Sequence, residues 1–339
     1  MGSDGKTQKG MTRRDFFKGA AGAGAAAAGL GSFVKLETAS GNTPMALESM
    51  DTGAAELKYE KYFAKNVVKK NQWEGEGIGL SSVPKSVIPE DARMTLGISV
   101  VRTPYMFHEP THKHLFTEYF FFFGSNPLDM NEFDADVEFS FGAEREKHVI
   151  SSPTIVTIPP GVYHSPLNFA RVGKPFYCLE AFLTSEYSGV DLGQDLTEIR
   201  IPESNYNRYF TKDVVKENER GGEGIWLDSV PEAIIPAAAK MTLGISVVRK
   251  PYMANDTTHK HPFTEFFFFL GSNPMDMSEL DADVEFSFGA EREKHVISSP
   301  TVVTVPAGVY HCPHNFARIG KPIYCLEAFL TSKYEGTNL

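Results

Sequence analysis

The sequence predicts an all-β protein made of two tandem domains, each of them a sandwich or a barrel. The first observation is an internal repeat at a constant offset of 147 residues, with YEKYF at 59–63 recurring as YNRYF at 206–210. The second is that a chain of 339 residues with 42% hydrophobic residues can fill two cores. The third is a series of short strand-like segments without any long helical period. A period this long exceeds the units of solenoids and matches a whole domain.

The N-terminal residues form a segment of their own. The stretch MTRRDFFKGAAGAGAAAAGLGSF begins with the adjacent Arg13 and Arg14 and continues with a weakly apolar run of alanine and glycine. It resembles a twin-arginine export signal, and it is too short and too weakly apolar for a membrane span. The alternative is a disordered tail. We assign residues 1–40 to the signal and 41–58 to a flexible lead-in.

The resemblance to a twin-arginine signal has a consequence for localisation and for cofactor loading. That export machinery carries proteins that are already folded, so we expect a periplasmic or other extracytoplasmic protein whose metal is inserted before export. Early insertion matters because divalent affinities rise toward copper, and a weaker-binding ion would otherwise lose the competition.

Each repeat contains the same succession of strand-like segments. In the first repeat they are MTLGISVV (94–101), ADVEFSFG (135–142), KHVIS (147–151), TIVTIPPG (154–161) and PFYCLEAFL (175–183). They are rich in β-branched and aromatic residues and are separated by turn residues. Closure of such strands into a barrel removes exposed edges. We place the domains at 59–188 and 206–336, joined by a linker at 189–205.

Charge and cysteine content limit the partners. The net charge is −10, and residues 1–40 are net basic, so the remainder is more acidic than the whole. An acidic body without a basic stripe excludes nucleic acid as the expected partner. Cys178 and Cys325 are equivalent in the two repeats, whereas Cys312 corresponds to Ser165, so no disulfide framework is indicated. Cys312 follows His311 and either contacts a site there or is a small core residue.

One repeated motif places histidines ahead of a run of phenylalanines. It reads THKHLFTEYFFFFGSN at 111–126 and THKHPFTEFFFFLGSN at 258–273. On a strand, side chains alternate between faces, so His112, His114 and Glu118 point to one side, and Phe120 and Phe122 continue that face. Two imidazoles and a carboxylate on one face are ligands for a divalent metal ion.

A second motif follows about forty residues later in each repeat. It reads IPPGVYHSPLN at 158–168 and VPAGVYHCPHN at 305–315. Its Pro-x-Gly turn presents a single histidine, His164 or His311, at the start of the next segment. Each repeat therefore offers three histidines and one glutamate.

Together the two motifs resemble those of the cupin family, and their repetition resembles a bicupin. The resemblance covers roughly residues 59–188 and 206–335. Pro-x-Gly-x-x-His-x-x-x-Asn fits fully from Pro159 and from Pro306. The first motif departs slightly, because Gly124 and Gly271 come one residue early, and the glycines that usually lead each motif are absent. The resemblance implies two jelly-roll barrels with one divalent ion in each, held by His112, His114, Glu118 and His164, and by His259, His261, Glu265 and His311.

Histidines on apolar strands can also be hydrogen-bonded core residues, and many cupins lack a metal. Retention of all four ligand types in both repeats favours metal binding. Three imidazoles and one carboxylate leave one or two positions open on a five- or six-coordinate ion, which is what substrate chemistry requires. The resemblance implies iron, manganese, nickel, copper or zinc, and we expect manganese or iron. Zinc held by four protein ligands would be closed.

Other polar residues are candidates for chemistry or for structure. Glu180 and Glu327 lie in the last apolar strand of each repeat, where an unpaired carboxylate is costly. Each is either a general acid or base in the cavity, a residue at the rim, or part of a structural ion pair, for which Arg102 and Arg249 are candidate partners. The repeated AEREKH at 143–148 and 290–295 is predicted to be the turn of a hairpin, and the acidic segments at 129–136 and 276–283 are predicted surface loops.

Three functions are compatible with this sequence. The first is an enzyme that decarboxylates or oxidatively cleaves a small oxygen-rich acid, or a phenolic or enolic substrate, with oxalate decarboxylases and quercetin-type dioxygenases as family analogies. The second is an isomerase or lyase that uses the ion only as a Lewis acid. The third is a protein that binds a metal or a small ligand without turnover. The aromatic walls favour an organic ligand, and closed homo-oligomeric association is compatible with the sequence.

Overall fold

The computed structural model describes residues 57–71, 73–92, 94–184, 188–193, 205–218, 221–239, 241–331 and 333–339. The predicted signal at 1–40, nearly all of the lead-in at 41–58 and most of the linker at 189–205 lie outside the described residues. Within the described ranges, no helix combines the length and the apolar character needed to cross a membrane.

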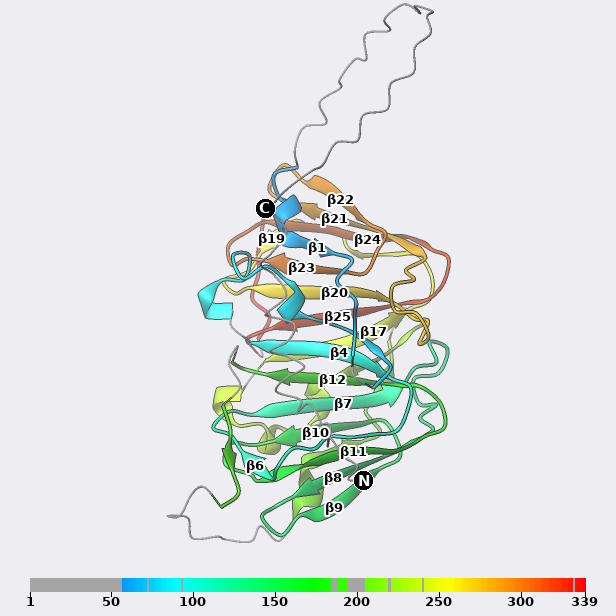
Figure 1. Ribbon diagram of the computed structural model, residues 1–339. Helices are drawn as coiled ribbons and strands as arrows, with labels where there is room; N and C mark the ends of the chain where they lie inside the picture. The colour runs from blue at the N-terminus through cyan, green and yellow to red at the C-terminus, as the bar shows by residue number, and fades with distance from the viewer. Residues whose placement is uncertain are drawn as a thin grey trace, which may run out of the picture.

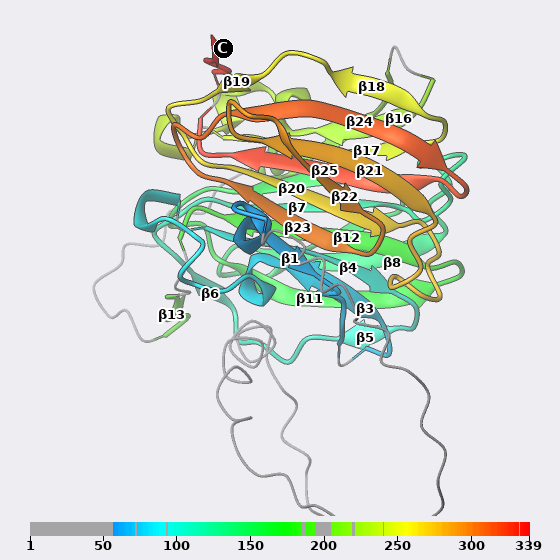
Figure 2. The ribbon, with the colours of Figure 1, turned by 90° about the horizontal axis from the view of Figure 1, so that it is seen from above.

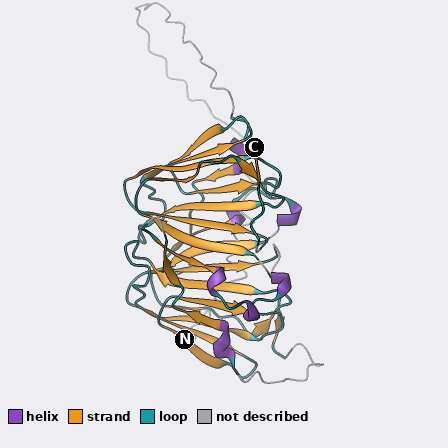
Figure 3. Ribbon diagram, turned by 180° about the vertical axis from the view of Figure 1, so that it is seen from behind, coloured by secondary structure: helices purple, strands orange, loops and turns teal. Residues whose placement is uncertain are grey.

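The predicted fold class is confirmed, because the described residues form antiparallel β-sheets joined by turns and 3-10 helices (Figure 3). Each barrel consists of one seven-stranded and one six-stranded sheet that enclose an aromatic core, as in a double-sheet jelly roll. The strands of residues 57–193 are β1 (Phe63–Lys65), β2 (Lys69–Lys70), β3 (Glu76–Gly79), β4 (Thr95–Val101), β5 (Tyr105–Met106), β6 (His112–Lys113), β7 (Glu118–Gly124), β8 (Ala135–Phe141), β9 (Glu146–Ile150), β10 (Thr154–Ile158), β11 (His164–Val172), β12 (Phe176–Phe182) and β13 (Val190–Asp191).

The second repeat follows the same order. Its strands are β14 (Phe210–Lys212), β15 (Val215–Glu217), β16 (Glu223–Trp226), β17 (Thr242–Val248), β18 (Tyr252–Asn255), β19 (His259–Lys260), β20 (Glu265–Gly271), β21 (Ala282–Phe288), β22 (Glu293–Ile297), β23 (Thr301–Val305), β24 (His311–Ile319), β25 (Ile323–Phe329) and β26 (Thr337–Asn338). The 3-10 helices are η1 (Glu60–Tyr62), η2 (Leu80–Ser82), η3 (Glu90–Ala92), η4 (Tyr206–Tyr209), η5 (Leu227–Ser229), η6 (Glu232–Ile234) and η7 (Ala237–Ala239).

The phenylalanine run of each repeat is buried on both faces of its strand. In β7, Phe120 and Phe122 point into the core of the first barrel, as the alternation predicts. Tyr119, Phe121 and Phe123 point the other way, into a core that both repeats share. Because neither face of the strand meets water, the sequence reads as a continuous apolar run. Burial of each such side chain stabilises the fold by about 1.5–3 kcal/mol.

The shared core lies between the two seven-stranded sheets and holds the barrels together. It combines Phe121 and Leu179 of the first repeat with Phe268 and Leu326 of the second, all of them fully buried. Figure 1 shows the consequence, with the second repeat in yellow to red stacked on the first in cyan to green.

The first strand of each repeat belongs to the barrel of the other. β1, from the start of the first repeat, pairs with β23 of the second, with Phe63 opposite Val303. β14, from the start of the second repeat, pairs with β10 of the first, with Phe210 opposite Val156. The blue β1 accordingly lies beside β23 in both Figure 1 and Figure 2. Each exchanged strand extends an edge of the other repeat's seven-stranded sheet.

The AEREKH segments are hairpin turns, as predicted, between β8 and β9 and between β21 and β22. Their histidines are nevertheless buried, because the exchanged segments cover them. The ring of Phe210 stacks on His148 with centroids 4.6 Å apart, and that of Phe63 stacks on His295 at 4.3 Å. These turns therefore take part in the contact between the repeats.

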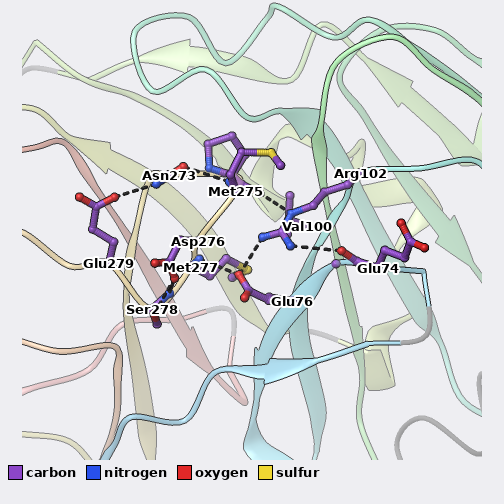
Figure 4. A network of polar contacts seen from close by, with 12 residues as sticks. Glu74, Glu76, Val100, Arg102, Asn273, Met275, Asp276, Met277, Ser278 and Glu279 are labelled. Carbon is purple, nitrogen blue, oxygen red and sulfur yellow. Dashed lines mark hydrogen bonds and ion pairs between the residues drawn. The ribbon is translucent and has the colours of Figure 1, made fainter.

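A partly buried ion pair in each repeat holds a loop of the other repeat, and Figure 4 shows the network around Arg102. Arg102 Nη2 lies 2.7 Å from Glu76 Oε2, and its Nε donates to the Pro274 carbonyl oxygen at 2.7 Å. The main-chain N–H of Met277 donates to the same Glu76 oxygen at 2.8 Å. The loop after β20 is thus held by main-chain contacts to a charged pair of the first repeat.

The second repeat makes the same contacts in return. Arg249 Nη2 lies 2.8 Å from Glu223 Oε2, and Arg249 Nε donates to Pro127 O at 2.8 Å. Of the alternatives for Glu180 and Glu327, an ion pair with Arg102 or Arg249 is not formed, because these arginines pair with Glu76 and Glu223. Both arginines lie at the contact between the repeats. Their guanidinium N–H groups donate to main-chain carbonyl oxygens of loops and to the carboxylate of Glu76 or Glu223.

Candidate metal centres

The first cluster forms where three strands of the first repeat begin. His112 lies in β6, His114 follows it, Glu118 opens β7, and His164 opens β11 opposite His112. Glu118 Oε2 lies 3.0 Å from His114 Nε2 and 3.3 Å from His164 Nε2. The ring of His164 has its centroid 4.5 Å from that of His112 and 4.8 Å from that of His114. All four predicted residues are buried and adjacent, with His112 in contact with the ring of His164.

The second cluster repeats this arrangement at β19, β20 and β24. The rings of His259 and His311 have centroids 4.3 Å apart, and His261 lies 4.8 Å from His259 and 5.0 Å from His311. Glu265 Oε2 is 3.3 Å from His311 Nε2 and 3.7 Å from His261 Nε2. In the first cluster, donor atoms of His114, Glu118 and His164 fall within 4.8 Å of one another, and in the second those of the three histidines do.

The six histidines all face their cluster with the same ring nitrogen. Each Nδ1 lies against a main-chain carbonyl oxygen, at 2.7 Å for His114 and 2.8 Å for His259 and His261. A carbonyl only accepts, so Nδ1 carries the proton and the Nε2 lone pair points to the centre of the cluster. The remaining acceptors are Pro110 for His112, Val162 for His164 and Val309 for His311. Such support is what orients histidine ligands of metals.

Burial sets the protonation of the second cluster. Desolvation lowers the pKa of His261 and of His311 to about 4, and it lowers the pKa of His259 as well. The imidazoles are therefore neutral at neutral pH, the form that binds metals. Burial also raises the pKa of Glu265 to about 7, while a hydrogen bond with Glu327 acts in the opposite direction.

The donor set fits a divalent metal ion. The Nε2 atom of His261 is buried and has no hydrogen-bond partner among the described residues, the nearest carboxylate oxygen being that of Glu265 at 3.7 Å. An unpartnered buried nitrogen costs stability unless something satisfies it. A cation at the centre of the cluster would accept this lone pair together with those of the other two imidazoles and the carboxylate.

Glu180 and Glu327 hold the same register position in the two barrels. Glu180 in β12 lies opposite Phe120, and Glu327 in β25 lies opposite Phe267. Glu327 hydrogen-bonds the carboxyl group of the candidate ligand Glu265, and it also contributes to raising the pKa of Cys312. Glu180 is buried, on the strand face that Phe176 and Cys178 present to the barrel core. Glu327 thus lies beside the second cluster.

The residue after the last histidine of each cluster has an unusual backbone. Ser165 and Cys312 have φ angles of +78° and +71°, which non-glycine residues rarely adopt. Both are buried. Burial is the main reason that the pKa of the Cys312 thiol is raised, and the Glu265 carboxylate adds to it. Cys312 is therefore both a small buried residue and a neighbour of the second cluster.

Tyr334 is the site residue that sequence reasoning missed. Its hydroxyl lies 2.9 Å from His259 Nε2, and its ring centroid is 4.7 Å from that of His261. A signal was present in the repeat, because TSEYSG at 184–189 corresponds to TSKYEG at 331–336. The equivalent Tyr187 lies outside the described residues.

The two barrels also differ inside. Where the first barrel has the buried Leu167, the second has His314, whose ring lies 5.6 Å from Phe267 and 5.1 Å from Phe286. The second barrel therefore carries an extra polar group in its aromatic interior.

No protein-family model matches the chain, and no curated protein matches it. Solved structures do match. A Lactobacillus farciminis oxalate decarboxylase in complex with formate is 12% identical, with a TM-score of 0.49 over 80% of this chain and 86% of that one. Bacillus subtilis oxalate decarboxylase at pH 4.6 is 11% identical, with a TM-score of 0.47 over 78% of this chain and 74% of that one.

Proposed function

We propose that the chain is an exported bicupin with one divalent metal ion in each barrel, and that it converts a small oxygen-rich organic acid or a phenolic or enolic compound by decarboxylation or oxidative cleavage. One observation carries this proposal. In each repeat three histidines and one glutamate lie side by side in the barrel, three of their donor atoms fall within 4.8 Å of one another, and main-chain carbonyls hold the imidazoles in the metal-binding tautomer.

The donor set supports manganese or iron. His259, His261, Glu265 and His311 would hold the ion in the second barrel, and the four equivalent residues would hold it in the first. Four protein donors leave one or two positions on a five- or six-coordinate ion, which suits bidentate oxygen ligands. When bound, such an ion polarises substrate oxygens and can exchange an electron with the substrate.

Phenylalanines next to the clusters favour a planar, partly apolar substrate. Phe116 stacks on His114 with centroids 4.1 Å apart, and Phe263 stacks on His261 at 4.7 Å. Each of these rings stacks in turn on the phenylalanine that ends the last barrel strand, Phe182 or Phe329. This wall holds the ligand rings in place and limits the access of water to the cluster.

Glu327 is placed to handle a proton in the second barrel. Loss of carbon dioxide from a carboxylate leaves a carbon atom that must take up a proton. The Glu327 carboxyl group acts on the pKa of Glu265, against the effect of burial, so the two carboxyl groups could share a proton next to the cluster. We assign Glu327, and Glu180 at the equivalent position, the role of general acid or base.

The first experiment measures metal content in the full chain. Protein recovered after export is compared with a His112→Ala/His259→Ala double variant, with the exposed His108→Ala as a control. About two manganese or iron ions per chain, lost in the double variant and kept in the control, support the proposal. The same metal content in all three proteins contradicts it and favours a ligand-binding barrel.

The reaction class is tested with the loaded protein. Small dicarboxylic acids and phenols are supplied with and without dioxygen, and carbon dioxide release is measured. Turnover that needs dioxygen supports oxidative cleavage, and carbon dioxide release without net oxidation supports decarboxylation. Isomerisation or elimination without either indicates Lewis-acid chemistry and contradicts the proposed reaction.

Export is proposed from the twin-arginine motif. The folded chain would use the twin-arginine export machinery and act outside the cytoplasm, where a small molecule rather than nucleic acid is its partner. Replacement of Arg13 and Arg14 by lysine should leave the protein in the cytoplasm, as cell fractionation would show. Export that is unchanged in this variant would contradict the assignment of residues 1–40.

A further inference from the structure

The last described segment, Lys333–Leu339, runs over the second cluster and is tied to it by its main chain. β26 pairs with β19, with Asn338 opposite His259. The Glu335 carbonyl oxygen accepts the Nδ1 proton of His261 at 2.8 Å, and Leu339 N–H donates to Thr258 O at 2.9 Å. The segment is therefore anchored on both sides of Gly336 to the strand that carries two candidate ligands.

This anchoring places the Tyr334 hydroxyl on the metal-facing atom of a ligand. The hydroxyl lies 2.9 Å from His259 Nε2. Nδ1 of His259 donates to the Thr257 carbonyl, so Nε2 carries the lone pair and the phenol donates to it. The phenol oxygen thus lies along the direction in which a metal ion would bind.

The hydrogen bond and a bound ion exclude each other. An ion ligated by Nε2 would lie about 2.0–2.1 Å from that nitrogen, which is nearer than the phenol oxygen and in the same direction. The phenol must then give up its hydrogen bond. Because Glu335 and β26 keep the main chain in place, a small outward movement of the ring leaves the oxygen beside the ion.

We propose that Tyr334 is a fifth protein ligand of the second metal centre, bound through its phenol oxygen. Binding of a trivalent or divalent ion would break the O–H bond and form an oxygen–metal bond, and the proton would pass to solvent, because Tyr334 is 56% exposed. Oxygen donors suit manganese and iron. This inference rests on the metal-binding part of the proposed function.

The consequence is that a substrate meets one open position fewer in the second barrel, unless it displaces the phenol. The test uses ferric ion, since a phenolate bound to iron(III) gives a charge-transfer band in visible light that imidazole and carboxylate ligands do not give. The full chain carries His112→Ala and His164→Ala, so that only the second centre can bind. Iron content is measured on the same samples as the absorption spectrum.

We expect about one iron per chain and a visible charge-transfer band in this parent protein. Adding Tyr334→Phe should remove the band while iron remains bound, and adding Tyr187→Phe should leave the band unchanged. Bound iron without a band in the parent, or a band that survives Tyr334→Phe, overturns the assignment of Tyr334 and leaves the metal centre standing. A parent that binds no iron overturns both the ligand assignment and the metal centre.

Discussion

Phe63 stacks on His295 with ring centroids 4.3 Å apart, although the two residues belong to different repeats. The contact exists because β1 leaves its own repeat and extends the sheet of the other barrel at β23. We expect the two barrels to unfold together, since each depends on a strand supplied by the other.

Phe63→Ala tests this coupling. The side chain is buried, and its removal should lower the free energy of unfolding by about 3–5 kcal/mol. Unfolding of the first repeat is followed by the fluorescence of Trp73 during denaturant titration. Trp226→Phe is included in every protein so that Trp73 is the only tryptophan. Although Phe63 packs in the second barrel, the Trp73 transition should shift by the full amount. An unchanged Trp73 transition would show that the barrels unfold independently.

Arg102→Ala should destabilise the molecule more than the loss of an ordinary surface ion pair. It leaves the Glu76 carboxylate without its cation and removes the donor to Pro274 O, at a side chain only 14% exposed. A fully buried pair that is broken costs about 3–5 kcal/mol and an exposed pair at most about 1 kcal/mol, so this partly buried pair should cost an amount between the two. The matched control is Arg171→Ala, which breaks two solvent-exposed pairs and should shift the midpoint much less. Equal midpoints in guanidinium for the two variants would contradict this prediction.

The stability of the metal-free protein should depend on Glu265 in a defined pH window. Its pKa is raised from 4.5 to about 7 by burial, so the folded protein holds a proton that the unfolded chain loses. The stabilisation from this proton is complete below pH 4.5 and is lost as the pH rises through 7. Glu265→Gln removes this pH-dependent stabilisation. The free energy of unfolding of the variant, relative to that of the wild type, should therefore rise by about 3 kcal/mol between pH 4.5 and pH 7, at about 1.4 kcal/mol for each pH unit.

The histidines act in the opposite direction and provide the internal control for that experiment. The pKa values of His261 and His311 fall from 6.5 to about 4 by burial, so their contribution is present above pH 6.5 and is lost as the pH falls toward 4. The loss of stability between pH 6.5 and pH 4 should therefore remain in Glu265→Gln when the free energy of unfolding is measured by chemical denaturation at each pH. A constant stability difference between the two proteins from pH 4 to pH 8 would contradict the raised pKa of Glu265.

Glu327→Gln tests the proposed proton transfer. If these glutamates deliver or remove a proton, kcat should fall by about 10²–10⁴-fold in the Glu180→Gln/Glu327→Gln double variant, while KM and metal content stay near their original values. Glu327→Gln alone should remove only the share of kcat that the second centre supplies. Glu180→Gln is the parallel variant in the first barrel, and the double variant tells whether one centre or both turn over. A double variant with unaltered kcat would remove both glutamates from the mechanism.

The fold class and both clusters follow from local sequence patterns. Alternation along one strand is enough to put His112, His114 and Glu118 on one face, and a Pro-x-Gly turn is enough to present His164. Such arguments need only the geometry of a strand and a turn, and the structure brings these residues together as the patterns indicate.

The strand exchange could not be predicted in the same way. YEKYF and YNRYF are similar segments, and two nearly identical barrels offer β1 and β14 nearly identical edges. The local sequence predicts that each segment is a strand, but it does not predict which barrel the strand joins. The partners of Arg102 and Arg249 depend on that same long-range arrangement, and so does the path of the chain that brings Tyr334 to His259.

The reciprocal exchange also bears on the symmetry of the molecule. Two separate chains of one repeat each could close both barrels by trading their first strands across a twofold axis, as in a domain-swapped dimer. A lone copy would leave the edge of β10 uncovered, which invites association with other chains. By joining the repeats, the polypeptide replaces an equilibrium that depends on protein concentration with one that does not, and both barrels can close at any dilution.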